Sequence, residues 1–162
     1  MKPWLTRQQL IEQLDACIWV DEQCFVLAGR CARTSEGETH VAWCARTALH
    51  HAWRAEQLRS VRPFDVHAPD RGAIETPLTD AHAAMVDPLL RDAITLVRGD
   101  TNGASAAVVP NMTIDALRSE VLSRQLRAYR QLEERLDPMR DMPVIRMLRI
   151  VSEDLAFDLS QS

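Results

Sequence analysis

Two ionisable residues, Asp21 and His51, fall on the apolar faces of consecutive amphipathic segments. Asp21 lies at the centre of an apolar stripe in residues 6–33, and His51 lies within the stripe of residues 38–60. If both segments are helices joined by the short turn near residue 36, facing positions have numbers that sum to about 72. Asp21 and His51 meet this condition. We therefore expect them to lie at one level of a shared interior.

A buried carboxylate is costly unless it is paired, protonated or bound to a cation. Asp21 and His51 could therefore be metal ligands, an acid/base pair or a structural hydrogen bond that fixes helix register. Glu22 reaches the same interior if its helix rotates by a few tens of degrees, and Asp154 lies at the margin of a later apolar face. The predicted metal ligands are thus Asp21, His51, Glu22 and Asp154. They would hold a single iron, manganese or zinc ion, unless no cofactor is bound.

A second polar group, His82, Gln125 and Tyr129, also falls on apolar faces. These residues could bind a cofactor or another small molecule, or His82 could simply hydrogen-bond within the core. If residues 77–97 and 110–136 form an antiparallel helix pair, His82 lies level with about residue 127. The direction of the helix at 77–97 decides whether the core has one polar cluster or two.

The cysteines and tryptophans allow further interpretations. Heptad-spaced Cys17, Cys24 and Cys31 lie about 10 Å apart along a helix, too far to share a metal, so we interpret them as core residues. Three tryptophans lie off the centres of the apolar arcs: Trp19, Trp43 and Trp53. They could cover the flank of the bundle or form a dimer interface, and aromatic residues at an exposed edge favour the interface. His50 falls on the polar side of its helix and is expected to be solvated.

The elements that must position these residues are all helical. Apolar residues recur with helical spacing, and no alternating run of strand length occurs. Thr6 and Gln9 are typical of a capping box at the start of the first helix. The expected helices cover residues 6–33, 38–60, 77–97, 110–136 and 144–159. Long connections are expected at 61–76 and 98–111, within a single domain over 1–162.

Each apolar face can be written out by advancing about 100° per residue. The first helix is expected to bury Leu10, Leu14, Cys17, Ile18, Cys24, Phe25, Ala28 and Ala32. The second is expected to bury Val41, Cys44, Ala45, Ala48, Ala52 and Ala55.

Composition narrows the function classes. The formal net charge is −4, and 26% of the residues are charged, which argues against a nucleic-acid binder. The sequence has no signal-peptide pattern and no apolar run of about 20 residues, so we expect a cytoplasmic protein without a membrane partner. Its cysteines should be reduced there.

Two segments resemble small bacterial ferritin-like proteins of uncertain function: Trp19-Val-Asp-Glu-Gln-Cys-Phe25 and His50-His-Ala-Trp-Arg-Ala-Glu-Gln-Leu58. The resemblance implies an up-down four- to five-helix bundle of the kind whose core can hold two metal ions. A standard di-metal centre needs Glu-x-x-His on two helices, and this sequence has none. Ala48 stands where the glutamate preceding His51 should be. We therefore expect a degenerate site.

Three functions follow as hypotheses. The first is a non-catalytic ferritin-like bundle that acts as a binding or accessory protein for a small molecule or a protein. The second is a metal-dependent oxidoreductase with a reduced ligand set. The third is an interaction module, and a homodimer is expected under the first and third hypotheses.

Overall fold

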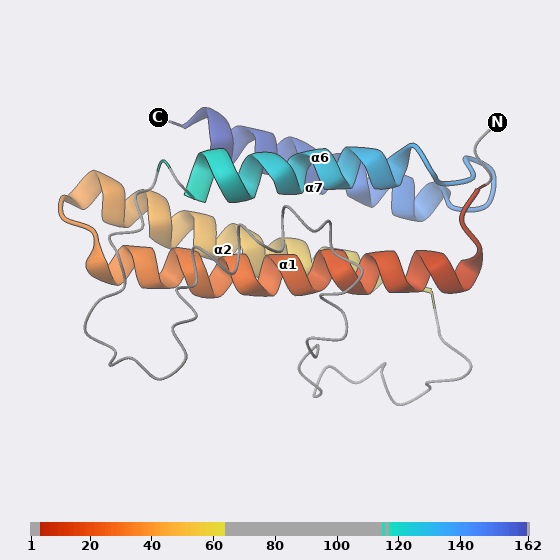
Figure 1. The fold of residues 1–162 in the computed structure, drawn as a ribbon, viewed down its shortest axis with the longest axis horizontal. Coiled ribbons are helices and arrows are strands. Elements are labelled where there is room, and N and C mark those ends of the chain that lie inside the picture. Colours follow the sequence, from red (N-terminus) through yellow and green to blue (C-terminus); the bar gives the residue numbers. More distant parts are fainter. Residues whose placement is uncertain (1–3, 64–114, 116, 162) are drawn as a thin grey trace.

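Helices form every regular element in the described part of the chain. The computed structural model describes residues 4–63, 115 and 117–161. In chain order the elements are α1 (Arg7–Thr34), α2 (Glu38–Val61), the π-helix η2 (Leu117–Leu122), α6 (Ser123–Glu133) and α7 (Met142–Ser160) (Figure 1). The predicted all-α class is confirmed for these residues. Several predictions lie outside these described residues: the helix at 77–97 with its His82, the connection at 98–111, and the connection at 61–76 except for its first three residues.

Local sequence signals set the ends of the first two helices. The predicted capping box is confirmed, because Thr6 Oγ1 accepts from the Gln9 backbone N–H at 3.2 Å and Gln9 Oε1 accepts from the Thr6 N–H at 2.9 Å. Gly37 precedes α2 with φ of +94°, a conformation that glycine adopts without steric penalty. The two helices therefore form a tight antiparallel hairpin.

A second hairpin follows from η2 and α6 into α7. The predicted helix at 110–136 ends earlier, at Glu133, because the chain tightens and the N–H groups of Arg135 and Leu136 bond carbonyls three residues back. The helix predicted at 144–159 begins at Met142, since Pro143 fits its first turn. The break predicted between Pro138 and Pro143 is therefore confirmed, with its end displaced by two residues.

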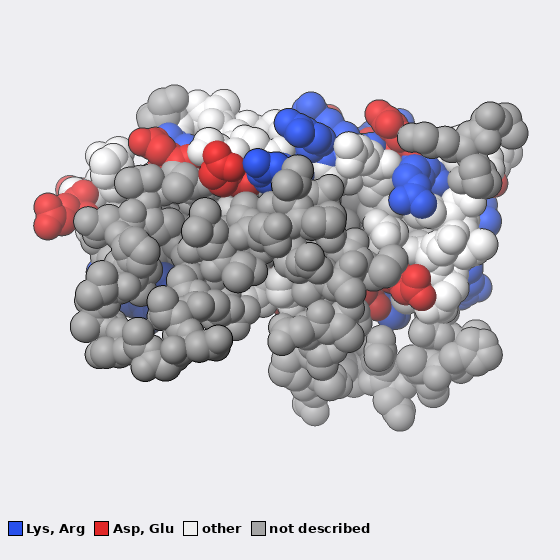
Figure 2. All heavy atoms as spheres, viewed as in Figure 1, with Lys and Arg blue, Asp and Glu red and all other residues white. Residues whose placement is uncertain are grey.

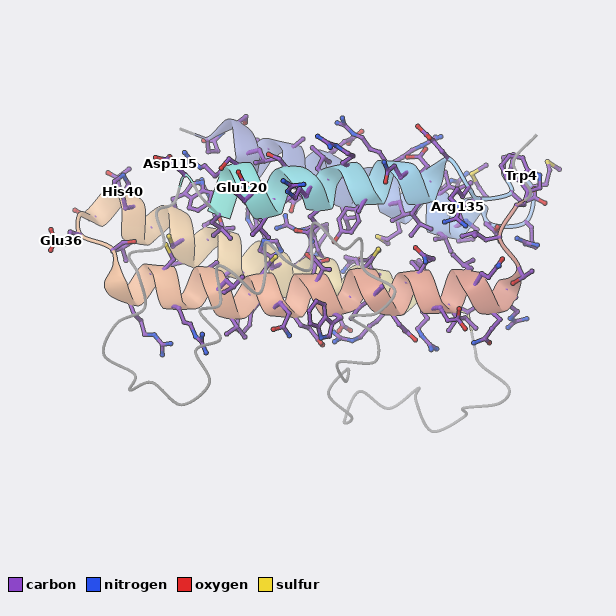
Figure 3. The ribbon with its side chains drawn as sticks, viewed as in Figure 1. Trp4, Glu36, His40, Asp115, Glu120 and Arg135 are labelled. Carbon is purple, nitrogen blue, oxygen red and sulfur yellow. The ribbon has the colours of Figure 1, made fainter. Side chains whose placement is uncertain are left out.

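The two hairpins pack into a four-helix bundle in which α1 runs antiparallel to α6 and α2 runs antiparallel to α7. Leu5 and Arg135 share a backbone hydrogen bond of 3.2 Å, which places the start of α1 beside the end of α6. Trp43 Nε1 donates to the Asp158 carbonyl at 3.4 Å, which places the start of α2 beside the end of α7. Figure 3 shows Trp4 and Arg135 at one end of the bundle and Glu36 and His40 at the other. Consequently, α2 and α6 run in the same direction.

The core lies between the hairpins. The residues that it buries differ from several of those predicted for α1 and α2. Phe25 was expected to be buried but is 45% exposed, because the buried stripe of α1 turns toward Leu27 and Cys31 near its end. Ala45 and Ala52 are also exposed. The buried face of α2 is wider than expected because α2 contacts both α1 and α7. Its buried residues are Trp43, Cys44, Thr47, Ala48, His51, Arg54, Ala55 and Leu58.

The tryptophans divide into buried and exposed pairs. Trp19 and Trp43 are buried, whereas Trp4 and Trp53 are exposed. An interface role for Trp19 or Trp43 therefore does not fit this arrangement. On the face in Figure 2, acidic and basic side chains are interspersed over the described surface. Among the described helices, none has the length and apolar character to cross a bilayer.

Candidate functional site

Asp21 is the centre of a buried polar network. Its side chain is fully buried, and His51 Nδ1 lies 2.7 Å from its Oδ1. Because an ionised carboxylate can only accept, Nδ1 carries the proton and donates it. The predicted pairing of Asp21 with His51 is therefore confirmed. Their predicted role as metal ligands remains a prediction.

Two side chains from α6 complete the shell of Asp21. Gln125 Nε2 donates to Asp21 Oδ1 at 2.7 Å and also contacts the Tyr129 hydroxyl at 2.8 Å. The Tyr129 hydroxyl donates to the other oxygen, Oδ2. Gln125 Oε1 in turn accepts from the Cys24 thiol at 3.8 Å. Gln125 and Tyr129, predicted to form a group with His82, are therefore part of the Asp21 cluster.

Arg54 links this cluster to α7. Its side chain is fully buried, with Nε 3.5 Å from Asp21 Oδ1. Its Nη1 donates to Asp158 Oδ2 at 3.0 Å and to Asp154 Oδ2. Burial works against the charged guanidinium, but nearby Asp21 and Asp158 outweigh this effect and raise the pKa of Arg54. Arg54 therefore stays protonated and shares its charge among three carboxylates.

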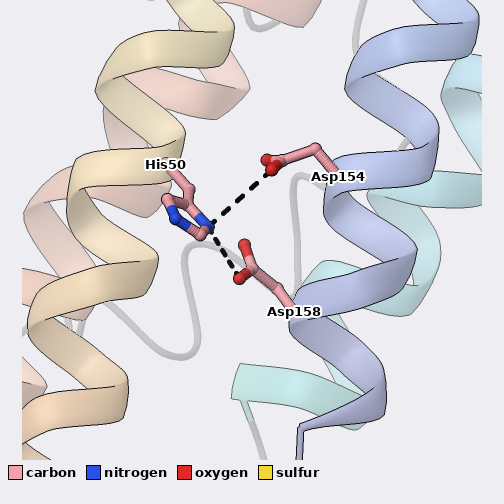
Figure 4. Close-up of side chains that lie close together, drawn as sticks. All are labelled: His50, Asp154 and Asp158. Carbon is pink, nitrogen blue, oxygen red and sulfur yellow. Dashed lines mark hydrogen bonds and ion pairs between the residues drawn. The ribbon is translucent and has the colours of Figure 1, made fainter.

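The network ends at a half-buried edge between α2 and α7. His50 Nδ1 lies 2.8 Å from Asp158 Oδ1 and 3.9 Å from Asp154 Oδ1 (Figure 4). The His50 and Asp154 side chains are 28% and 26% exposed, whereas Asp158 is fully buried. The expectation that His50 is solvated on the polar side of α2 is thus wrong. This edge of α2 faces α7 because α7 packs beside the hairpin.

His51 carries an unused lone pair. Burial outweighs the attraction of Asp21 and lowers the pKa of His51, so its ring is neutral. With Nδ1–H held by Asp21, Nε2 is an acceptor, and no group in the described residues bonds it. A histidine oriented in this way by a carboxylate can act as a base or as a metal ligand.

The four predicted metal ligands do not form one group. Glu22 ion-pairs with Arg59, away from the core. Among the described residues, Asp154 is linked to Asp21 through Arg54, which contacts both carboxylates. Within the described residues, the group of His, Cys, Asp and Glu side chains with metal-like spacing is His50, Asp154 and Asp158. It contains one of the predicted ligands, Asp154.

Three members of the network were not among the predicted site residues: Arg54, His50 and Asp158. Arg54 lies three residues after His51, so its burial was readable from helical spacing. Its charge, however, favoured the polar side. Asp154 and Asp158 are one turn apart, which places both carboxylates on one face of α7. The α2–α7 contact that brings them to His50 joins distant parts of the chain and has no local signal.

The cysteines form a separate feature near the α1–α2 turn. Cys31 and Cys44 hydrogen-bond to each other, and the Cys31 Sγ also lies 3.5 Å from Ser35 Oγ. The bond from Cys44 lowers the pKa of Cys31 to about 6, whereas the same bond and burial raise the pKa of Cys44. Burial also raises the pKa values of Cys17 and Cys24. Cys24 and Cys31 are buried in the hydrophobic core and the partly buried Cys17 packs against it, which confirms the predicted packing of all three.

No protein-family model, curated protein or solved structure matches this chain. The site must therefore be interpreted from its own geometry. Its hydrogen bonds hold a buried carboxylate, and its outer edge presents a histidine and two aspartates.

Replacing Asp21 by alanine should strongly destabilise the protein. The change strands donors on His51, Gln125 and Tyr129 and removes a counter-charge of Arg54. We expect a loss of about 3–5 kcal/mol in the free energy of unfolding, measured by urea denaturation. Glu12→Ala is the control, because Glu12 is only partly buried and bonds Gln8 on its own helix. Equal losses in both variants would contradict this account of the core.

Ionisation of Cys31 should make stability depend on pH. Its pKa is about 6 in the folded chain and 9.0 in the reference state, so the unfolded chain binds more protons between these values. Stability should therefore rise with pH across this window and fall as pH drops through about 6. Melting temperature and ultraviolet thiolate absorbance would measure this effect.

Cys31→Ser should flatten the pH dependence. Cys17→Ser is the matched control, because the pKa of Cys17 is raised and its thiol stays protonated. A pH dependence that persists in Cys31→Ser would refute the assignment of the low pKa to Cys31.

Proposed function

We propose that this protein is a cytoplasmic, ferritin-like helical bundle without a standard di-iron centre, and that it acts as a non-catalytic binding or accessory protein. The directions of the helices support the resemblance to ferritin-like bundles. α2 and α6 run parallel, as the helices before and after one long crossover connection must. Both hairpins contribute polar side chains to the middle of the bundle, as di-metal bundles do.

The observation that carries this proposal is the position of Arg54. In a di-metal bundle, metal ions neutralise the carboxylates that project into the core. Here the Arg54 guanidinium contacts Asp21, Asp154 and Asp158 and supplies a positive charge among them. Asp21 also accepts hydrogen bonds from three side chains. The charge network therefore stabilises the bundle without a metal bound to Asp21.

The alternative of a metal-dependent oxidoreductase draws support from one atom. His51 Nε2 is buried and has no hydrogen-bond partner among the described residues, as a metal-binding nitrogen would be before the ion enters. His51 Nε2 would then bind an iron or manganese ion beside the polar network. The two functions therefore differ in whether this nitrogen binds a redox metal.

His51→Asn separates them. The introduced side-chain amide can still donate to Asp21 in place of Nδ1–H, whereas the Nε2 position is lost. For the untagged protein, elemental analysis should give the same iron and manganese content in the wild type and in His51→Asn. About one equivalent in the wild type that disappears in the variant would instead favour the oxidoreductase.

A homodimer is part of the proposal. Trp53 lies three residues from His50 and Phe157 three residues from Asp154, so both flank the α2–α7 seam. Leu49 is exposed one turn from Trp53. Exposed apolar side chains gathered on one face are typical of protein interfaces.

Trp53→Ser combined with Phe157→Ser should weaken the dimer. We expect the wild type to sediment as a dimer and the double variant to shift toward monomer at the same concentration. Phe25→Ser is the control, because Phe25 is equally apolar and exposed but lies on α1. Monomeric wild type, or dissociation by Phe25→Ser alone, would contradict this interface.

A further inference from the structure

In the cluster of His50, Asp154 and Asp158, the two oxygen atoms of each carboxylate have different neighbours. Arg54 Nη1 contacts the Oδ2 atoms of both Asp154 and Asp158. The Oδ1 atoms of the same carboxylates face His50 Nδ1 instead, at 3.9 and 2.8 Å (Figure 4). Each carboxylate is therefore oriented from one side by the guanidinium. Its remaining oxygen points to a space shared with one imidazole nitrogen.

These three facing atoms have the spacing of metal ligands. All lie within 4.8 Å of one another. A tetrahedral zinc ion about 2.0–2.2 Å from each ligand separates its ligands by about 3.4 Å. The distances from His50 Nδ1 to the two oxygens lie on either side of that value, so small side-chain rotations suffice.

The charge of the network also favours a cation at its outer edge. Asp21, Asp154 and Asp158 place three carboxylates around the single guanidinium of Arg54. A divalent ion at the outer edge would balance this charge where His50 and Asp154 are still open to solvent.

We propose that His50, Asp154 and Asp158 form a mononuclear site for a divalent transition-metal ion, with Zn²⁺ as the ion that fits best. One histidine and two carboxylates give three ligands once His50 Nδ1 loses the proton that it donates to Asp158 Oδ1, and the half-exposed side leaves a fourth position for water. Arg54 is a positioning residue that fixes the carboxylates from behind, as hydrogen-bonding partners of metal ligands do. The site lies outside the Asp21 shell and does not depend on the ferritin-like assignment.

The test is equilibrium dialysis of the full, untagged chain against Zn²⁺ alone, with bound zinc measured by elemental analysis. Wild type should bind one Zn²⁺ per chain, and His50→Ala should bind it about 100-fold more weakly. His40→Ala is the matched control, because His40 is exposed on the same helix and outside the cluster. It should bind as wild type does.

Co²⁺ gives a second readout, because its visible absorption reports the ligand geometry directly. Wild type and His40→Ala should give the absorption of a four-coordinate ion, and His50→Ala should lose it. If His50→Ala fails to fold, Asp154→Asn, at a half-exposed position, should show the same losses. Wild type that binds neither ion, or variants of the cluster that bind as tightly as wild type, would overturn the site. If the wild type contains iron or manganese and His51→Asn loses it but still binds zinc, the proposed function alone would be overturned.

Discussion

The need to compensate one buried carboxylate organises this bundle. Asp21 lies where an isolated charge would cost several kcal/mol, and its hydrogen bonds with His51, Gln125 and Tyr129 offset that cost. The donors of these hydrogen bonds lie on other helices than Asp21. Helix packing that moved any of the three helices by one turn would strand a polar group in the core. The carboxylate therefore makes the register of α1, α2 and α6 energetically specific, which apolar packing alone enforces more weakly.

Arg54 extends that constraint to the fourth helix. Its guanidinium reaches Asp21 on one side and the two α7 aspartates on the other, so it couples the fully buried centre to the half-exposed edge at His50. A protonated arginine keeps its charge at any accessible pH, whereas a metal ion can dissociate. The interior thus has a permanent cation, and the remaining negative charge lies toward the surface, where an exchangeable ion could reach it.

How much of this arrangement the sequence could predict depends on the length of the connection between partners. Asp21 and His51 are separated by one short turn, so their level follows from counting residues along the hairpin. Gln125 and Tyr129 could be placed on a core face by periodicity, but not opposite Asp21. That relation is set by packing between two hairpins that are far apart in the sequence. Arg54 was missed because periodicity assigns a charged residue at the margin of a stripe to solvent, unless its partners are known.

The same reasoning explains why the polar network and a metal ion need not compete. In a bundle whose core carboxylates bind metal directly, loss of the Glu-x-x-His pattern would leave buried charges uncompensated. Here the guanidinium of Arg54 compensates them from within, and its preference for the Oδ2 atoms leaves the Oδ1 atoms of Asp154 and Asp158 to face His50. A fold stabilised in this way does not require an ion for folding. Metal binding at the His50 edge would then report ion availability without deciding whether the bundle forms, which suits a binding protein better than a structural metal centre.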